Sequence, residues 1–144
     1  MADFHPMTVH FPIVLLILWP FIDGLSVKLQ KQEWSQLATG ILGLSLLASL
    51  FATITGQAAF DEAIAVGYDS DLLERHTLDA DLIPWLIIVL GIARFMLPKK
   101  IGAKGRWAAV CLGLALALFL VKVSYEGGNL VYNHGVGVSK TLGK

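Results

Sequence analysis

The sequence predicts an all-α integral membrane protein, a four-helix bundle that forms a single domain over residues 1–144. The first observation behind this prediction is composition: hydrophobic residues make up 56% of the chain and charged residues 15%, and the mean hydropathy is +0.68. Soluble domains average about 45–50% apolar and about 25% charged residues. A soluble domain of this length would leave too much apolar surface in water. The second observation is four apolar stretches, each close to the roughly 20 residues that cross a bilayer.

The four helices are expected at about residues 10–28, 35–58, 76–98 and 106–133. The first is apolar from its start, with Asp23 as its one interruption. The second carries no charge between Glu33 and Asp61 and meets the spanning length outright. The third and fourth reach that length only if they include Arg94 and Lys122, whose long stems can lie along apolar surface. The sequence indicates no internal repeat.

The charges of the loops predict the orientation. Basic residues gather in the loops at 28–31 and 99–106, whereas the 57–81 segment is mainly acidic. Because positively charged loops remain in the cytoplasm, we expect both termini and a long 57–81 loop on the outer, periplasmic side. The chain is therefore expected to be a multi-pass protein of the bacterial inner membrane, in contact with lipid.

Several function classes are excluded by composition. The formal net charge is zero, so there is no basic footprint for nucleic acid. The single cysteine, Cys111, leaves no disulfide framework and no cysteine-ligated zinc or iron–sulfur site. No nucleophile–base arrangement or glycine-rich phosphate loop is visible, so we do not expect an enzyme acting alone.

The histidines are the candidate functional residues. His5 and His10 precede or begin the first helix, His76 begins the third, and His134 follows the fourth. The topology therefore brings all four to one face of the membrane. Ionisable groups at this depth are functional candidates by default, and histidine is the commonest metal ligand.

Haem b is the cofactor that this arrangement favours, since helix bundles often hold cofactors between facing helices. Gly127 lies seven residues before His134, and a continuous helix would place both on one face, with room for the macrocycle. His5 and His10 would point about 140° apart on one helix, so they cannot both bind one iron from the same side. Four histidines allow one or two haems, in an electron-transfer subunit that takes electrons from a quinol or a partner's redox centre.

Two alternatives remain open at this point. The chain is either a cofactor-free structural subunit of a membrane complex, or a protein that binds or transports a metal ion at the periplasmic face. In the second case a hydrated zinc or copper ion would add oxygen ligands such as Asp79 and Glu126 to the histidines.

Two motifs at opposite ends of the chain carry a resemblance. The segments are HPMTVHFP at residues 5–12 and GGNLVYNHGVGV at residues 127–138. With them, the chain resembles the bacterial family "domain of unknown function 2231", small four-helix membrane proteins. The resemblance implies that the ligand candidates are His5, His10, His76 and His134. We expect His10 and His134 to be the first ligands, because they lie within the two motifs and on different helices, followed by His76 and then His5. Some relatives are joined to a Rieske-type iron–sulfur domain, which implies redox partners: other subunits of a membrane complex, a periplasmic cytochrome or an iron–sulfur protein.

Overall fold

The structure, a computed structural model, describes residues 4–68 and 70–138 and is built of helices only. The elements are α1 (His5–Thr8), α2 (His10–Leu29), α3 (Gln32–Ala65), α4 (Asp71–Ile101) and α5 (Ala103–Tyr132). α1 and α2 follow one another with a break only at Val9, so the chain has four helical stretches long and apolar enough to cross a membrane. The predicted all-α bundle of four spans is thus confirmed.

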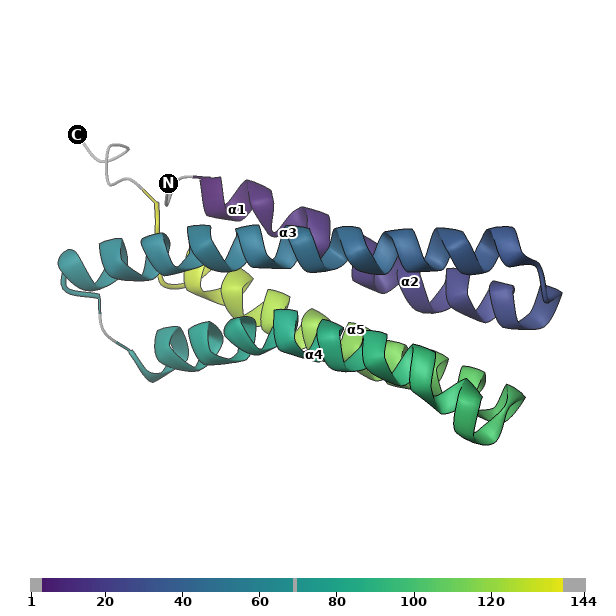
Figure 1. The fold of residues 1–144 in the computed structure, drawn as a ribbon. Coiled ribbons are helices and arrows are strands. Elements are labelled where there is room, and N and C mark those ends of the chain that lie inside the picture. The colour runs from purple at the N-terminus through teal and green to yellow at the C-terminus, as the bar shows by residue number, and fades with distance from the viewer. Residues whose placement is uncertain (1–3, 69, 139–144) are drawn as a thin grey trace.

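Figure 1 shows the helices side by side in two antiparallel hairpins, α2–α3 and α4–α5. The start of α1, the end of α5 and the connection between α3 and α4 lie at one end of the bundle. The two short turns within the hairpins lie at the other end. The histidines at the starts of α1 and α4 therefore belong to the same end.

Both hairpin turns are short because single residues adopt left-handed backbone angles. Gln30 ends α2 with φ at 53°, and Gly102 ends α4 with φ at 59° and ψ at −136°. Only glycine enters the latter region without steric cost. A Cβ on Gly105 would overlap the backbone of Leu97, so α4 and α5 approach closely just after the turn.

α3 and α4 extend further beyond their apolar parts than predicted. The prediction of a loop over residues 57–81 is therefore wrong. α3 continues to Ala65 and α4 begins at Asp71. Ser70 caps α4, since its Oγ accepts a hydrogen bond from the backbone N–H of Leu73 at 3.2 Å. Leu73 also packs with Ala63 and Leu130 in a small buried cluster. This packing and capping keep the polar end of α3 and the polar start of α4 helical. Hydropathy alone does not predict that these segments are helical.

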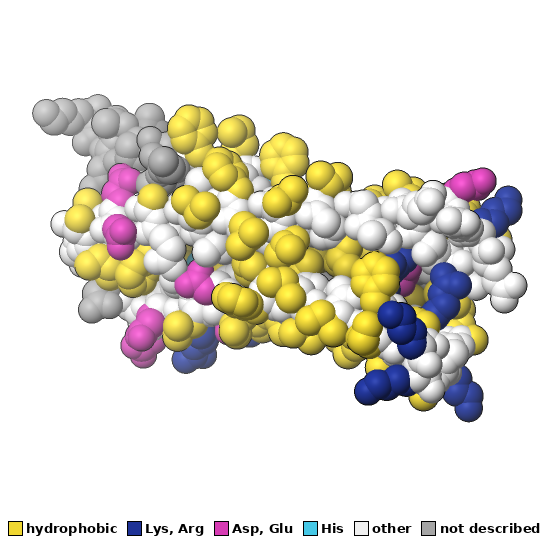
Figure 2. Space-filling model, viewed as in Figure 1, with side chains coloured by type: hydrophobic (Ala, Val, Ile, Leu, Met, Phe, Trp, Pro, Cys, Tyr) yellow, Lys and Arg dark blue, Asp and Glu magenta, His cyan; other side chains and the backbone are white. Residues whose placement is uncertain are grey.

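The bundle surface is apolar over the middle of its length. In the most apolar window of each span only 22–39% of the residues are buried inside the protein. Figure 2 shows hydrophobic side chains over the middle of one face, with most Lys and Arg toward one end and most Asp and Glu toward the other. Because a soluble protein rarely exposes such a continuous apolar surface, these helices contact lipid.

The two hairpins repeat one another at an offset of 71 residues, although the sequence indicates no repeat. Residues at this offset show matching burial. The pairs, with their exposed fractions, are Leu16 (1%) and Ile87 (2%), Trp19 (0%) and Leu90 (3%), and Ala38 and Ala109 (both 0%). The repeated property is burial, not residue identity, because a core position accepts many side chains of suitable volume.

Residues that are equivalent in this repeat also meet each other. Asp23 of α2 and Arg94 of α4 are 71 residues apart and form an ion pair at 2.8 Å. Equivalent residues contact each other only near a symmetry axis, so a pseudo-two-fold axis passes between α2 and α4, which lie diagonally in the bundle. Both hairpins start at the same end, and the axis therefore runs along the bundle.

Candidate functional site

The imidazole of His5 lies against the outer part of α3. A Cβ built on Gly56 would be 3.0 Å from His5 Cε1, so the lack of a side chain there lets the ring lie this close to α3. His5 Nδ1 is 3.2 Å from Thr55 Oγ1, and Thr55 Oγ1 is also 2.9 Å from Thr8 Oγ1. These contacts fix the orientation of the His5 ring through Nδ1.

The imidazole of His76 makes the same contact in the second hairpin. A Cβ on Gly127 of α5 would be 2.9 Å from His76 Cε1. His5 and Gly56 are 51 positions apart in sequence, and so are His76 and Gly127. Each histidine at the start of a hairpin therefore lies on a glycine of that hairpin's second helix.

His5 and His76 are also equivalent to each other at the 71-residue offset. The helix segments that carry them, α1 and the start of α4, lie at the end of the bundle opposite the hairpin turns. Of the four predicted histidines, these two hold equivalent positions in the repeat, each against a glycine.

Among the described residues, acidic side chains lie near His76. Glu126 takes the place in α5 that Thr55 has in α3, and the carboxylates of Glu126 and Asp79 act on His76. Lys122 Nζ pairs with Glu126 Oε1 at 3.1 Å, an i,i+4 contact, and also with Asp79. His76 Nδ1 and Glu126 Oε2 are buried and have no hydrogen-bond partner within residues 4–68 and 70–138. Buried polar atoms without partners are rare and mark places that a further group can occupy.

His10 lies elsewhere, on the outward face of α2. It is exposed. It lines an apolar groove of about 710 Å³ with side chains of α2 and α3, namely Phe11, Val14, Leu15, Leu44, Leu47 and Ala48.

His134 lies beyond the end of α5 and is exposed. Its ring meets the edge of Tyr68 at 6.4 Å between centroids. Because α5 ends at Tyr132, the expected helical face shared by Gly127 and His134 does not form. The space at Gly127 is taken by the ring of His76 instead.

The family model for the predicted membrane protein DUF2231 matches residues 2–140. The chain belongs to this family. No curated protein and no solved structure matched the chain. The match runs through both hairpins, so the family domain contains both halves of the repeat.

The two motifs of this DUF2231 chain, at residues 5–12 and 127–138, lie at the same end of the bundle. The first supplies His5 and His10, and the second supplies Gly127 and His134. Sequence reasoning missed Thr55 and the equivalence of His5 with His76. The signal for this equivalence is the constant spacing of 51 between each histidine and its glycine.

Proposed function

We propose that the protein is a membrane electron-transfer subunit that binds one haem b through His5 and His76. The observation that carries the proposal is the equivalent placement of two half-buried histidines, one from each hairpin, each seated against a glycine of that hairpin's second helix. A haem requires only two axial ligands, one for each face. His5 and His76, as equivalent residues of the two hairpins, would supply one ligand to each face of a single haem. We therefore propose one haem rather than two.

The donor set fits this cofactor. His5 Nδ1 contacts Thr55, which leaves Nε2 as the free donor, in the pattern by which metal-bound histidines are oriented. His76 has a buried nitrogen without a partner. Both rings lie against glycines, so their positions are fixed by packing. Haem supplies reversible one-electron transfer when it is bound, and two imidazole ligands favour this over oxygen chemistry.

The proposal includes the membrane, the orientation and the redox partners of the protein. The positive-inside rule puts the basic end at 28–31 and 99–106 in the cytoplasm, so the histidine end faces the periplasm of a bacterial inner membrane. There the subunit would exchange electrons with other subunits of a redox complex, a periplasmic cytochrome or an iron–sulfur protein.

A quinol is the proposed electron donor. The groove that His10 lines is apolar along its length and carries an imidazole at one end. This combination suits an isoprenoid tail and a hydrogen bond to a ring oxygen.

An optical spectrum of each histidine variant tests the haem proposal. The purified wild-type protein should show a Soret band and a b-type pyridine haemochrome. His5→Ala and His76→Ala should lose the low-spin bands and still insert into the membrane. His10→Ala and His134→Ala are the matched controls and should keep them. A colourless wild-type protein, or four unchanged spectra, would overturn the proposal.

A metal-ion site is the second candidate, favoured by the two buried atoms without partners, His76 Nδ1 and Glu126 Oε2. Among the described residues, no group of three or more His, Cys, Asp or Glu is arranged to hold a metal ion, which makes haem the better fit. Elemental analysis distinguishes the two: colourless protein that contains stoichiometric zinc or copper, lost in Glu126→Gln, would support the metal ion. Colourless and metal-free protein would support a purely structural subunit.

A further inference from the structure

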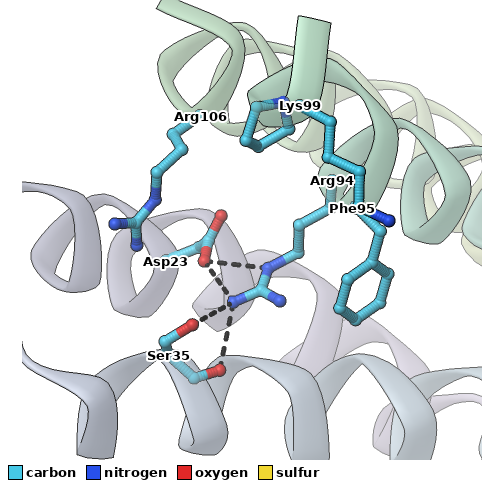
Figure 3. A pocket seen from close by; sticks show the side chains of 7 residues that line it. Asp23, Ser35, Arg94, Phe95, Lys99 and Arg106 are labelled. Atoms are coloured by element: carbon cyan, nitrogen blue, oxygen red, sulfur yellow. Dashed lines mark hydrogen bonds and ion pairs between the residues drawn. The ribbon is translucent and has the colours of Figure 1, made fainter. Parts of the chain in front are cut away.

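A second site lies at the end of the bundle opposite the histidines. It is a cavity of about 290 Å³ between the inner ends of α2, α3, α4 and α5. Figure 3 shows its polar side chains around Asp23, with Arg94 and Arg106 on either side of the carboxylate. Lys99 also lines it, so three cationic side chains and one carboxylate line the cavity.

The one carboxylate is already neutralised. Arg94 donates to Asp23 Oδ1 from Nε at 3.0 Å and from Nη2 at 2.8 Å. Nη2 also donates to the carbonyl of Ser35, and Nη1 to the hydroxyl of Thr39. The Arg94 side chain is 9% exposed and that of Asp23 is 4% exposed, so the pair is a fixed part of the wall.

The other two cations have no acidic partner among the described residues. Arg106 donates once, from Nη2 to Ser26 Oγ at 3.1 Å, and a guanidinium has five N–H donors. Lys99 adds an exposed ammonium at the last turn of α4. A half-enclosed cavity with two uncompensated cations concentrates anions.

The shape and position of the cavity select the type of anion. A guanidinium binds phosphate oxygens in pairs, which a compact ammonium can supplement. Phe95 and Pro98 form an apolar part of the wall, suited to the carbon atoms of an ester. The cavity lies where α4 ends and α5 begins, at the level of further basic side chains such as Lys100 and Lys104.

We propose that this cavity binds a phosphate group, through Arg106 and Lys99, from an anionic phospholipid at the membrane surface or from a soluble phosphate. The site is independent of the proposed haem, because it involves none of the histidines. Two probes separate the sources: phosphatidylglycerol in phosphatidylcholine nanodiscs, and inorganic phosphate added to protein in pure phosphatidylcholine.

The experiment measures the thermal unfolding of the full chain with each probe, by tryptophan fluorescence. A rise in melting temperature with phosphatidylglycerol alone identifies a lipid, and a rise with inorganic phosphate identifies a soluble ligand. Arg106→Gln should bind that probe about tenfold more weakly, as expected for one lost charge-assisted contact. Lys104→Gln removes the same charge outside the cavity and should bind as the wild type does.

Two results would overturn the proposal. One is the absence of any stabilisation of the wild-type protein by either probe. The other is an equal effect of Arg106→Gln and Lys104→Gln, which would mean general attraction to a charged surface. If Arg106→Gln does not fold, Lys99→Gln replaces it, because Lys99 makes no hydrogen bond between helices in the structure; its binding must then be weaker than that of Lys104→Gln.

Discussion

Asp23 and Arg94 occupy the same position in the two halves of the bundle and bind each other, although one is an acid and the other a base. The pseudo-two-fold axis brings two copies of one position into contact. Two identical charges at that place would repel each other. Opposite charges at equivalent positions therefore allow a polar contact on the axis inside an otherwise apolar bundle.

We predict that the two halves of this ion pair are unequal in their contribution to stability. Arg94→Gln leaves the buried Asp23 carboxylate with one hydrogen bond among the described residues, from the hydroxyl of Ser26, and should lower the free energy of unfolding by about 3–5 kcal/mol. Asp23→Asn should cost less, because Arg94 keeps its bonds to Ser35 and Thr39. Thermal unfolding of both single variants and of the double variant measures the difference. The prediction fails if Asp23→Asn lowers the free energy of unfolding more than Arg94→Gln does. It also fails if the loss in the double variant equals the sum of the losses in the two single variants.

Substitutions at Gly127 and Gly128 test whether the position of the His76 ring matters for haem binding, with Gly128 as the control. Gly127→Leu should displace the ring of His76, since even a Cβ would be 2.9 Å from it, and should lower haem content several-fold. Gly128→Leu should have little effect, because nothing lies within 4 Å of its Cβ position. Haem content per inserted protein is the measurement. Equal haem content in the two variants would show that the seating of His76 does not matter for binding.

Gly113 and Gly43 form a second matched pair, for packing. A Cβ on Gly113 would overlap the ring of Trp19, which is fully buried and donates from Nε1 to the carbonyl of Ala38 at 2.9 Å. Gly113→Leu should therefore lower the melting temperature and shift the tryptophan emission. Gly43→Leu should change neither, because nothing lies within 4 Å of its Cβ position. Similar melting temperatures for the two variants would contradict the close packing of α2 on α5.

Orientation is tested by reporter fusions. Alkaline phosphatase fused after Lys144 should be active in the periplasm, and a fluorescent protein inserted at the Gly102 turn should fluoresce in the cytoplasm. The reason is that the basic residues at 28–31 and 99–106 should remain inside. The opposite pattern would place the histidines on the cytoplasmic side and exclude periplasmic electron acceptors.

Much of the architecture follows from the sequence because hydropathy acts on each helix separately. The length of an apolar stretch decides whether that stretch spans a bilayer, whatever its neighbours are. The extensions of α3 and α4 could not be predicted in this way, since their polar residues are held helical by the Ser70 cap and by contacts among Ala63, Leu73 and Leu130. Those contacts join three separate segments of the chain.

The sequence by itself determined that the chain has four spans, a basic end and a histidine end, because these depend only on residue type and order. It also placed all four histidines near one face. Only the tertiary structure decided that His5 and His76 take equivalent, half-buried places against glycines while His10 is exposed, and that Asp23 meets Arg94. The physical reason is rotation: a helix turns by about 100° per residue, so the partner of each side chain depends on how the two hairpins pack around their common axis.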